Sequence, residues 1–225
     1  MEILFEDNHL IAVNKSNTDI VQVDKTGDLS LEDKVKLYIK EKYNKPGDVF
    51  LGVAHRIDRP VSGAVLFART SKALLRLNEM FQKKEVKKIY WAIVKEKPRE
   101  TSETLKHYIV RNQIKNKSFA NDKDVKDSKE ASLTYNLIAS AENYYLLEID
   151  LHTGRHHQIR CQLAKIGCPI KGDLKYGFPR SNPDGGISLH SRKIEFIHPV
   201  TKQQITIVAH PPKDALWDYF LNLVK

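Results

Sequence analysis

The chain has 225 residues, of which 41% are hydrophobic and 29% are charged. These values exclude a short peptide and a disordered chain, and they predict a single globular domain over 1–225. Lys and Arg number 37 against 28 for Asp and Glu, and the resulting charge of +9 favours anionic partners, nucleic acid first among them. A basic chain can also simply carry solvated lysines.

The cysteine content and the N-terminus indicate a compartment. Cys161 and Cys168 are too few for a disulfide framework and suit a reducing environment, where we expect ordinary thiols. The N-terminus carries acids where a signal peptide would carry lysines, and no apolar run approaches the roughly 20 residues of a membrane span. We expect a cytoplasmic protein without membrane contact.

The first 94 residues alternate strand and helix patterns. We predict a hairpin over 3–13, a helix over 30–43 that begins with a Ser30/Asp33 capping box, a strand over 63–69 buried on both faces, a helix capped by Ser71 and a strand over 89–94. Lysines crowd the end of the second helix, at positions 83, 84, 87 and 88.

The rest of the chain is richer in strands. Residues 95–130 are polar, and we predict an exposed loop there. Further patterns predict strands over 133–139, 144–151, 187–190, 193–197 and 204–209, a helix over 156–166 and a last helix over 213–224 with a core-facing stripe. The sum is a mixed α+β domain.

Asp58 lies within His-Arg-Ile-Asp-Arg-Pro-Val-Ser-Gly, residues 55–63, ahead of the predicted buried strand. The flanking cationic groups favour an ionised carboxylate, which can act as a nucleophile or a base. The same residues also fit a structural ion pair at a strand edge.

A second polar cluster covers residues 151–160, where a strand ends, a glycine turn follows and a helix begins. Such a helix start suits a phosphate or the polar edge of a base. His152 and His156 lie near Cys161 and Cys168, but their spacing lacks the short ligand pair of a zinc site, so we expect no metal.

These segments resemble one family. Residues 55–63 are similar to His-Arg-Leu-Asp-x-x-Thr-Ser-Gly, and 153–160 to Thr-Gly-Arg-x-His-Gln-Ile/Leu-Arg, of the RluA-type RNA pseudouridine synthases. Residues 6–15, 88–92, 167–177 and Leu189-His190 resemble further motifs of that family in the same order. Two positions depart from it: Ser16-Asn17-Thr18 stands where Pro and a small residue are usual, and Val61 replaces Thr.

The resemblance implies a mixed, largely antiparallel central sheet flanked by helices, with an RNA-binding cleft, in a short form lacking the N-terminal S4 domain. It implies isomerisation of uridine to pseudouridine in ribosomal or transfer RNA, without a metal or organic cofactor. We expect a monomer that does not act on DNA. The alternative is a non-catalytic RNA-binding or ribosome-assembly protein that retains the fold.

The resemblance also implies roles for individual residues. Asp58 is the essential carboxylate, which attacks the sugar or removes a sugar proton, and Arg160 pairs with it. Tyr90 packs on the target base, and the alternative is a tyrosine in the core of a strand. The expected substrate-binding residues are Arg56, His55, Ile159 and Arg155. Asp173, in a Gly-Asp-x-x-Tyr-Gly turn, is expected to be structural.

Overall fold

The computed structural model describes residues 1–23 and 27–224, and the chain divides into two compact units. Unit 1 comprises Met1–Val86 and Ser191–His210, and unit 2 comprises Lys87–His190 and Pro211–Lys225. Each unit buries its own apolar clusters. The single domain over 1–225 stays a prediction.

Unit 1 is built on β-strands: β1 (Glu2–Glu6), β2 (Leu10–Lys15), β3 (Gly52–Val53), β4 (Ser62–Ala68) and β11 (Gln204–Val208). It also includes strand β10 (Leu189–Ile197) from Ser191 onward. The N-terminal hairpin β1–β2 is confirmed, and β2 and β3 pair antiparallel with β4. Every residue of β4 is buried, as predicted for a strand covered on both faces.

Strand β10 corrects one sequence prediction, because the two strands expected over 187–190 and 193–197 are one. The polar pair Ser191-Arg192 interrupts the apolar pattern without interrupting the strand. The Ser191 hydroxyl donates to the carbonyl of Ala64 (3.1 Å), and the carbonyl of Arg192 accepts from the Ala209 N–H (2.9 Å). Polar groups satisfied in this way can occupy a buried strand.

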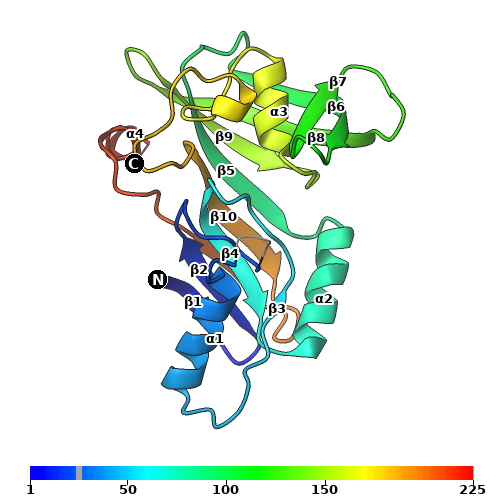
Figure 1. Cartoon of the computed structure of the whole chain (residues 1–225), viewed down its shortest axis with the longest axis vertical. Coiled ribbons are helices and arrows are strands. Elements are labelled where there is room, and N and C mark those ends of the chain that lie inside the picture. The colour runs from blue at the N-terminus through cyan, green and yellow to red at the C-terminus, as the bar shows by residue number, and fades with distance from the viewer. Residues whose placement is uncertain (24–26, 225) are drawn as a thin grey trace. The chain divides into compact units, whose positions relative to one another are not determined.

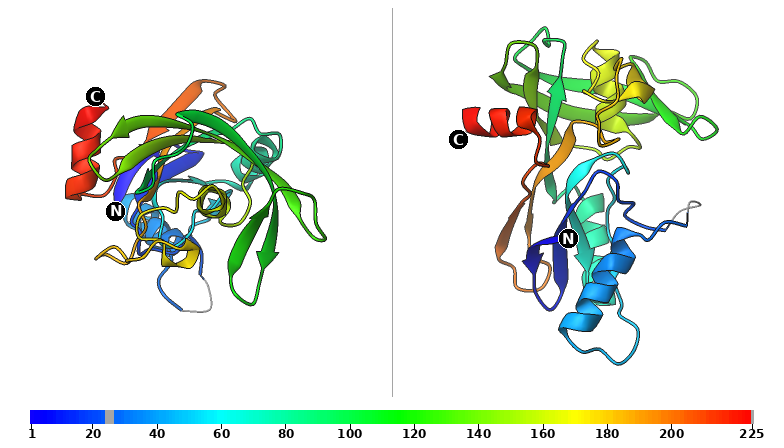
Figure 2. Two further views of the ribbon diagram at one scale, coloured as in Figure 1. Left: turned by 90° about the horizontal axis from the view of Figure 1, so that it is seen from above. Right: turned by 60° about the vertical axis from the view of Figure 1, so that its left-hand side comes forward.

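Two helices cover unit 1 and lie on the same side of its strands (Figure 2, right). Helix α1 (Leu31–Lys42) begins with both halves of the predicted capping box. Helix α2 (Ser71–Gln82) is capped by Thr70, not by Ser71 as predicted. Thr70 has extended backbone angles, and its hydroxyl accepts from the Ala73 N–H (3.2 Å), so Ser71 is already helical.

The strands of unit 2 are antiparallel in the order β5-β9-β8-β6-β7 (Figure 1): β5 (Lys87–Val94), β6 (Ser102–Asn112), β7 (Lys117–Asn121), β8 (Lys129–Ser140) and β9 (Tyr145–Leu151). The exposed loop predicted over 95–130 is therefore wrong for half of its length, where β6, β7 and the start of β8 lie. Leu105, His107 and Ile109 are buried on alternate positions of β6, while Ser102, Thr104 and Lys106 on its other face are polar and exposed. A strand pattern with so few apolar groups is easily read as a loop.

Unit 2 also contains α3 (Gln158–Lys165), the short helix η1 (Leu174–Tyr176) and α4 (Ala215–Leu223). Helix α3 packs beside β6 and β7 (Figure 1), and it begins later than predicted because His157 has a left-handed backbone (φ 53°). Trp217 and Phe220 of α4 are buried against β5 and β9, which confirms the core-facing stripe.

Both cysteines are buried thiols, and burial raises the pKa of Cys168 to about 11. Over the residues that the structure describes, no helix is long and apolar enough to cross a membrane.

Candidate active site

Asp58 lies in a tight turn immediately before β4. The carbonyl of Asp58 accepts the N–H of Val61 (3.0 Å), which closes the turn. Ile57 and Val61 are buried on either side, so the apolar neighbours fix the backbone while Asp58 itself is half-buried. A carboxylate held in this way has a defined position without being sealed from solvent.

Gly63 allows β4 to approach β10 closely. Its φ is +115°, and a Cβ placed on it would lie 2.5 Å from the backbone nitrogen of Ser191 and closer still to the carbonyl oxygen. Only glycine fits both constraints. The close approach of β4 to β10 therefore explains why the 55–63 motif ends in glycine.

Lys15 is buried (1% exposed) at the end of β2, and its ammonium group holds the Asp58 turn. It donates to the carbonyls of Ser16 (2.7 Å), Asp19 (2.7 Å) and Arg59 (2.9 Å). Burial lowers the pKa of Lys15 to about 7, against the opposing effect of the Asp19 and Asp58 carboxylates. The sequence places Lys15 in a motif but gives it no role. The available signal was a lysine close behind the apolar run of residues 10–13.

The other motif residues of unit 1 have separate contacts. His55 accepts the N–H of Leu66 at Nε2 (2.9 Å), and its ring lies 5.0 Å from that of Phe81, which ties it to β4 and α2. Arg56 is exposed and lies 3.4 Å from the Gln22 side chain. Arg59 forms an ion pair with Asp28 (2.8 Å).

In unit 2, Gln158 organises the turn of the second motif. Its Oε1 accepts from the Thr153 hydroxyl (2.8 Å) and from the Arg155 N–H (3.0 Å), while its Nε2 donates to the Ser132 carbonyl (3.1 Å). Arg155 is exposed, and its Nε donates to the carbonyl of Glu130 (3.0 Å). The spacing of Thr153, Arg155 and Gln158 thus serves to close the turn between β9 and α3.

Arg160 is the most strongly held of the predicted site residues. Its Nε and Nη2 donate to the two carboxylate oxygens of Asp173 at 2.7 and 2.9 Å. Arg160 is 4% exposed and Asp173 is 1% exposed. The Tyr176 ring lies 5.1 Å from the guanidinium. Asp173, for which a structural role is expected, therefore binds the side chain of Arg160.

His156 and His157 form a stacked pair, with ring centroids 3.8 Å apart, before α3. Nδ1 of His157 lies 3.0 Å from the Tyr176 hydroxyl, which also contacts the backbone of Ser118. Burial, reinforced by the charge of Arg160, lowers the pKa of His157 to about 2, so this ring is neutral. His156 in turn lies within hydrogen-bond distance of a side chain, with its Nδ1 2.9 Å from the Ser118 hydroxyl.

Tyr90 and Ile159 are both buried, at 6% and 5% exposure, on β5 and in the first turn of α3. Lys88, two residues before Tyr90 on β5, lies close to the turn of the second motif. A Cβ placed on Gly154 would lie 3.6 Å from the Lys88 ammonium. Burial lowers the pKa of Lys88, and the Asp150 charge opposes this shift. The Lys88 side chain therefore lies beside the turn of the second motif.

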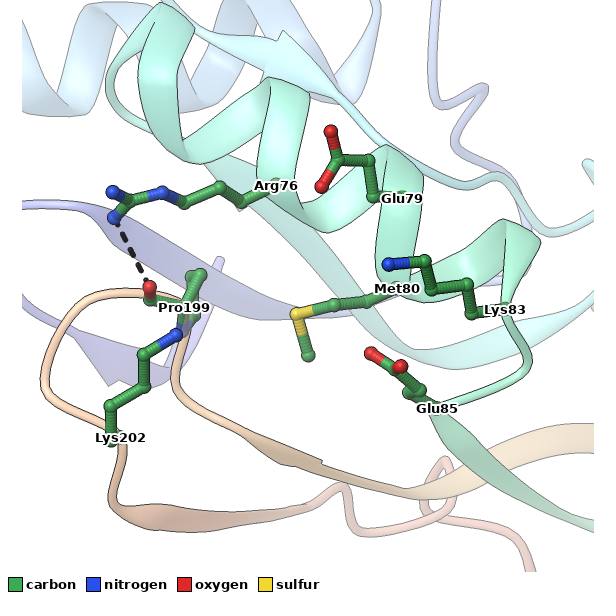
Figure 3. A pocket seen from close by; sticks show the side chains of 7 residues that line it. All are labelled: Arg76, Glu79, Met80, Lys83, Glu85, Pro199 and Lys202. Carbon is green, nitrogen blue, oxygen red and sulfur yellow. Dashed lines mark hydrogen bonds between the residues drawn. The ribbon is translucent and has the colours of Figure 1, made fainter.

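A cavity of about 280 Å³ lies in unit 1 at the end of α2 (Figure 3). Its wall is held by a hydrogen bond from Arg76 to the Pro199 carbonyl (3.1 Å). Lys83 and Lys202 share this wall with Glu79 and Glu85, so its charges are mixed. No residue of the predicted site lines it, and the RNA-binding cleft stays a prediction.

The predicted site residues fall into two groups. Unit 1 contains His55, Arg56 and Asp58. Unit 2 contains the remaining four, Tyr90, Arg155, Ile159 and Arg160. Within each unit the motif backbone is fixed by partly buried hydrogen bonds, centred on Lys15 and on Gln158. The sequence assigned no individual role to Lys15, Gln158 or Tyr176, all of which lie within the motifs.

Known proteins are similar to this chain in sequence and in fold. The family model of RNA pseudouridylate synthases matches residues 9–165. An uncharacterized RNA pseudouridine synthase of Bacillus subtilis is 31% identical over 218 residues, which cover 95% of this chain and 70% of the relative. The tRNA pseudouridine synthase C of Haemophilus influenzae is 29% identical over 99% of this chain and 97% of its own length. The ribosomal large subunit pseudouridine synthase C of Rickettsia prowazekii is 32% identical over 93% and 68%.

The fold is also found in a solved structure, that of human RNA pseudouridylate synthase domain containing 4. It matches 99% of this chain and 92% of its own with a TM-score of 0.79 at 22% identity. Together the fold and the matched motifs define a class of RNA-modifying isomerases, the pseudouridine synthases. This chain belongs to the RNA pseudouridylate synthase family, which confirms the resemblance drawn from its motifs.

Proposed function

We propose that this chain converts specific uridines of ribosomal or transfer RNA to pseudouridine, with Asp58 as the essential carboxylate. The observation that carries the proposal is the Asp58 turn. Asp58 is the acid of the 55–63 motif, and its backbone is anchored by the Val61 hydrogen bond and, through Arg59, by Lys15. Such preorganisation suits a group that must meet a reacting sugar in one orientation.

The reaction makes limited demands on the protein. The bond from uracil N1 to the sugar carbon breaks, the base turns, and C5 joins the same carbon while its hydrogen leaves as a proton. N1 gains a proton, so the atoms balance and no net oxidation occurs. A hydrolytic glycosidase needs a second carboxylate to protonate its leaving group. Here one carboxylate acts, by attack on the sugar or by removal of a sugar proton.

The remaining site residues have complementary roles in this proposal. Arg160 pairs with the Asp58 carboxylate and favours its ionised form. Tyr90 packs on the target base, and Ile159 belongs to the wall of its pocket. Arg56, His55 and Arg155 bind the RNA around the extruded nucleotide. The exposure of Arg56 and Arg155 supports contact with phosphate or base edges.

The substrate is structured RNA with the target in a loop, because extruding a base costs least where it is poorly stacked. The names of the relatives support two RNA classes, since one refers to the large ribosomal subunit and another to tRNA. The charge of +9 supports binding to the phosphate backbone. We propose a cytoplasmic monomer that acts on RNA and not on DNA.

Release of tritium from RNA labelled at uridine C5 tests this function, because forming the new bond expels that hydrogen. Wild type, Asp58→Asn and Asp28→Asn are incubated separately with bulk ribosomal and transfer RNA. Asp28→Asn is the matched control, since it makes the same substitution on an exposed acid that pairs with Arg59 in the same turn. We expect release by wild type and by Asp28→Asn in one RNA fraction and none by Asp58→Asn.

Filter binding of the same variants completes the test. Asp58→Asn should still bind RNA, because its turn is closed by backbone and Lys15 contacts that the substitution leaves in place. Binding by wild type without tritium release from either fraction would instead favour a non-catalytic RNA-binding protein. Release by Asp58→Asn at the wild-type rate would exclude Asp58 as the essential carboxylate.

A further inference from the structure

Asp173 and Arg160 form a two-point ion pair in the interior of unit 2. The two hydrogen bonds, 2.7 and 2.9 Å, run from Nε and Nη2 to separate carboxylate oxygens. Both side chains are almost fully buried. A paired carboxylate fixes both the position and the plane of a guanidinium, which a single contact cannot do.

The backbone of Asp173 is itself rigidly held. Its N–H donates to the Ile170 carbonyl (3.0 Å), and its own carbonyl accepts from the N–H groups of Tyr176 (3.1 Å) and Phe178 (3.0 Å). The preceding Gly172 has φ +87°, and a Cβ there would lie 2.7 Å from the Asn182 side chain. The carboxylate therefore has little freedom to follow Arg160, and it sets the position of that side chain.

Stability alone is a weak explanation for this arrangement. Removing two charges from water is costly, and a buried ion pair is often no more stabilising than apolar side chains of the same volume. Orientation is what the pair provides beyond stability. The Tyr176 ring, 5.1 Å from the guanidinium, further confines it.

We propose that Asp173 is a positioning residue for catalysis, which fixes the plane of the Arg160 guanidinium for the role that the proposed function gives Arg160. This inference rests on the proposed function. Asp173 itself does not touch the substrate. Its effect passes through Arg160, so removing the Asp173 charge should slow turnover and leave RNA binding largely intact.

A double-mutant cycle on turnover tests this role. We expect Asp173→Asn to lower kcat about 100-fold, the scale of a small misplacement of a catalytic group. KM should stay within about threefold of the wild-type value, because the lost interaction matters in the transition state. In an Arg160→Met background, Asp173→Asn should cause no further loss of kcat.

The control for stability is Leu146→Ala, which removes a fully buried side chain of β9 from the apolar cluster with Trp217 and Phe220. Leu146→Ala should have the wild-type kcat when activity is measured well below its melting temperature. This should hold even if Leu146→Ala and Asp173→Asn have the same unfolding midpoint. If Asp173→Asn does not fold, Arg160→Lys decides instead, because lysine keeps the charge but cannot form the two-point pair. Its kcat should fall about as far, 100-fold.

The outcomes separate the two proposals. Independent losses that multiply in the double variant, or wild-type kcat in Arg160→Lys, would overturn the positioning role while wild type remains active. An Asp173→Asn variant no slower than Leu146→Ala would do the same. Absence of tritium release from wild type would overturn both proposals together.

Discussion

The Lys15 ammonium donates a hydrogen bond of 2.9 Å to the carbonyl of Arg59, the residue next to Asp58. Two further bonds, to the carbonyls of Ser16 and Asp19, complete its buried environment. One side chain at the end of β2 thereby joins the loop after that strand to the turn of the 55–63 motif. The two segments are 44 residues apart in sequence, so the tie is tertiary.

Replacing Lys15 by methionine should destabilise the protein by about 2 kcal/mol, because the carbonyls lose their buried donor. The loss is measured as a shift in the urea unfolding midpoint. Lys34→Met is the matched control. It removes an ion pair with Asp19 (2.6 Å) that is more exposed, and it should cost less than about 1 kcal/mol. Equal losses in both variants would show that the three carbonyl bonds contribute nothing specific.

Stability should fall as the pH falls below neutrality because of His157. Its pKa is lowered to about 2 in the folded chain from an ordinary value of 6.5. Between these values the unfolded chain binds a proton that the folded chain does not, so the free energy of unfolding decreases as pH decreases. His157→Asn removes this contribution and tolerates the left-handed φ of 53°.

The test for His157 is the difference in unfolding free energy between wild type and His157→Asn, measured by urea denaturation from pH 7 to pH 5. Taking the difference cancels carboxylates that titrate in both proteins. Wild type should lose more stability than the variant across this range. A difference that is constant with pH would mean that folding does not lower the pKa of His157.

Gly63→Ala should cost about 3 kcal/mol or more, because the new methyl group meets the backbone of Ser191 and φ is +115°. Gly177→Ala separates the two causes. Gly177 has φ +99° but nothing within 4 Å of the added Cβ, so only backbone strain applies and the loss should be near 1 kcal/mol. Thermal unfolding of both variants checks the order. A larger loss for Gly177→Ala would contradict the close approach of β4 and β10.

Thr70→Ala should destabilise unit 1 by about 1 kcal/mol, because the Ala73 N–H at the start of α2 loses its side-chain acceptor. Ser71→Ala should change stability by less than about 0.5 kcal/mol, since Ser71 is exposed and alanine is the better helix former. Urea titrations of the two variants distinguish the caps. A larger loss for Ser71→Ala would restore the cap that the sequence had favoured.

Local patterns predicted the elements whose signals lie within a few residues. The capping box at Ser30, the fully apolar strand β4 and the stripe of α4 were each readable from spacing alone. Strands β6 and β7 were not, because only alternate residues of β6 are buried and most of the remainder are polar. Whether such a segment is a loop or a strand is decided by its pairing with β8, which no local pattern contains.

For the candidate site, the sequence by itself determined the family, through motifs matched in order, and with it the residues expected to act. Tertiary structure decided what holds them. The partner of Lys15 is 44 residues away, and that of Arg160 is 13 residues away across a turn. Hydrogen bonds between buried groups depend on which segments meet in space, and a motif records its own residues without recording the groups that they contact.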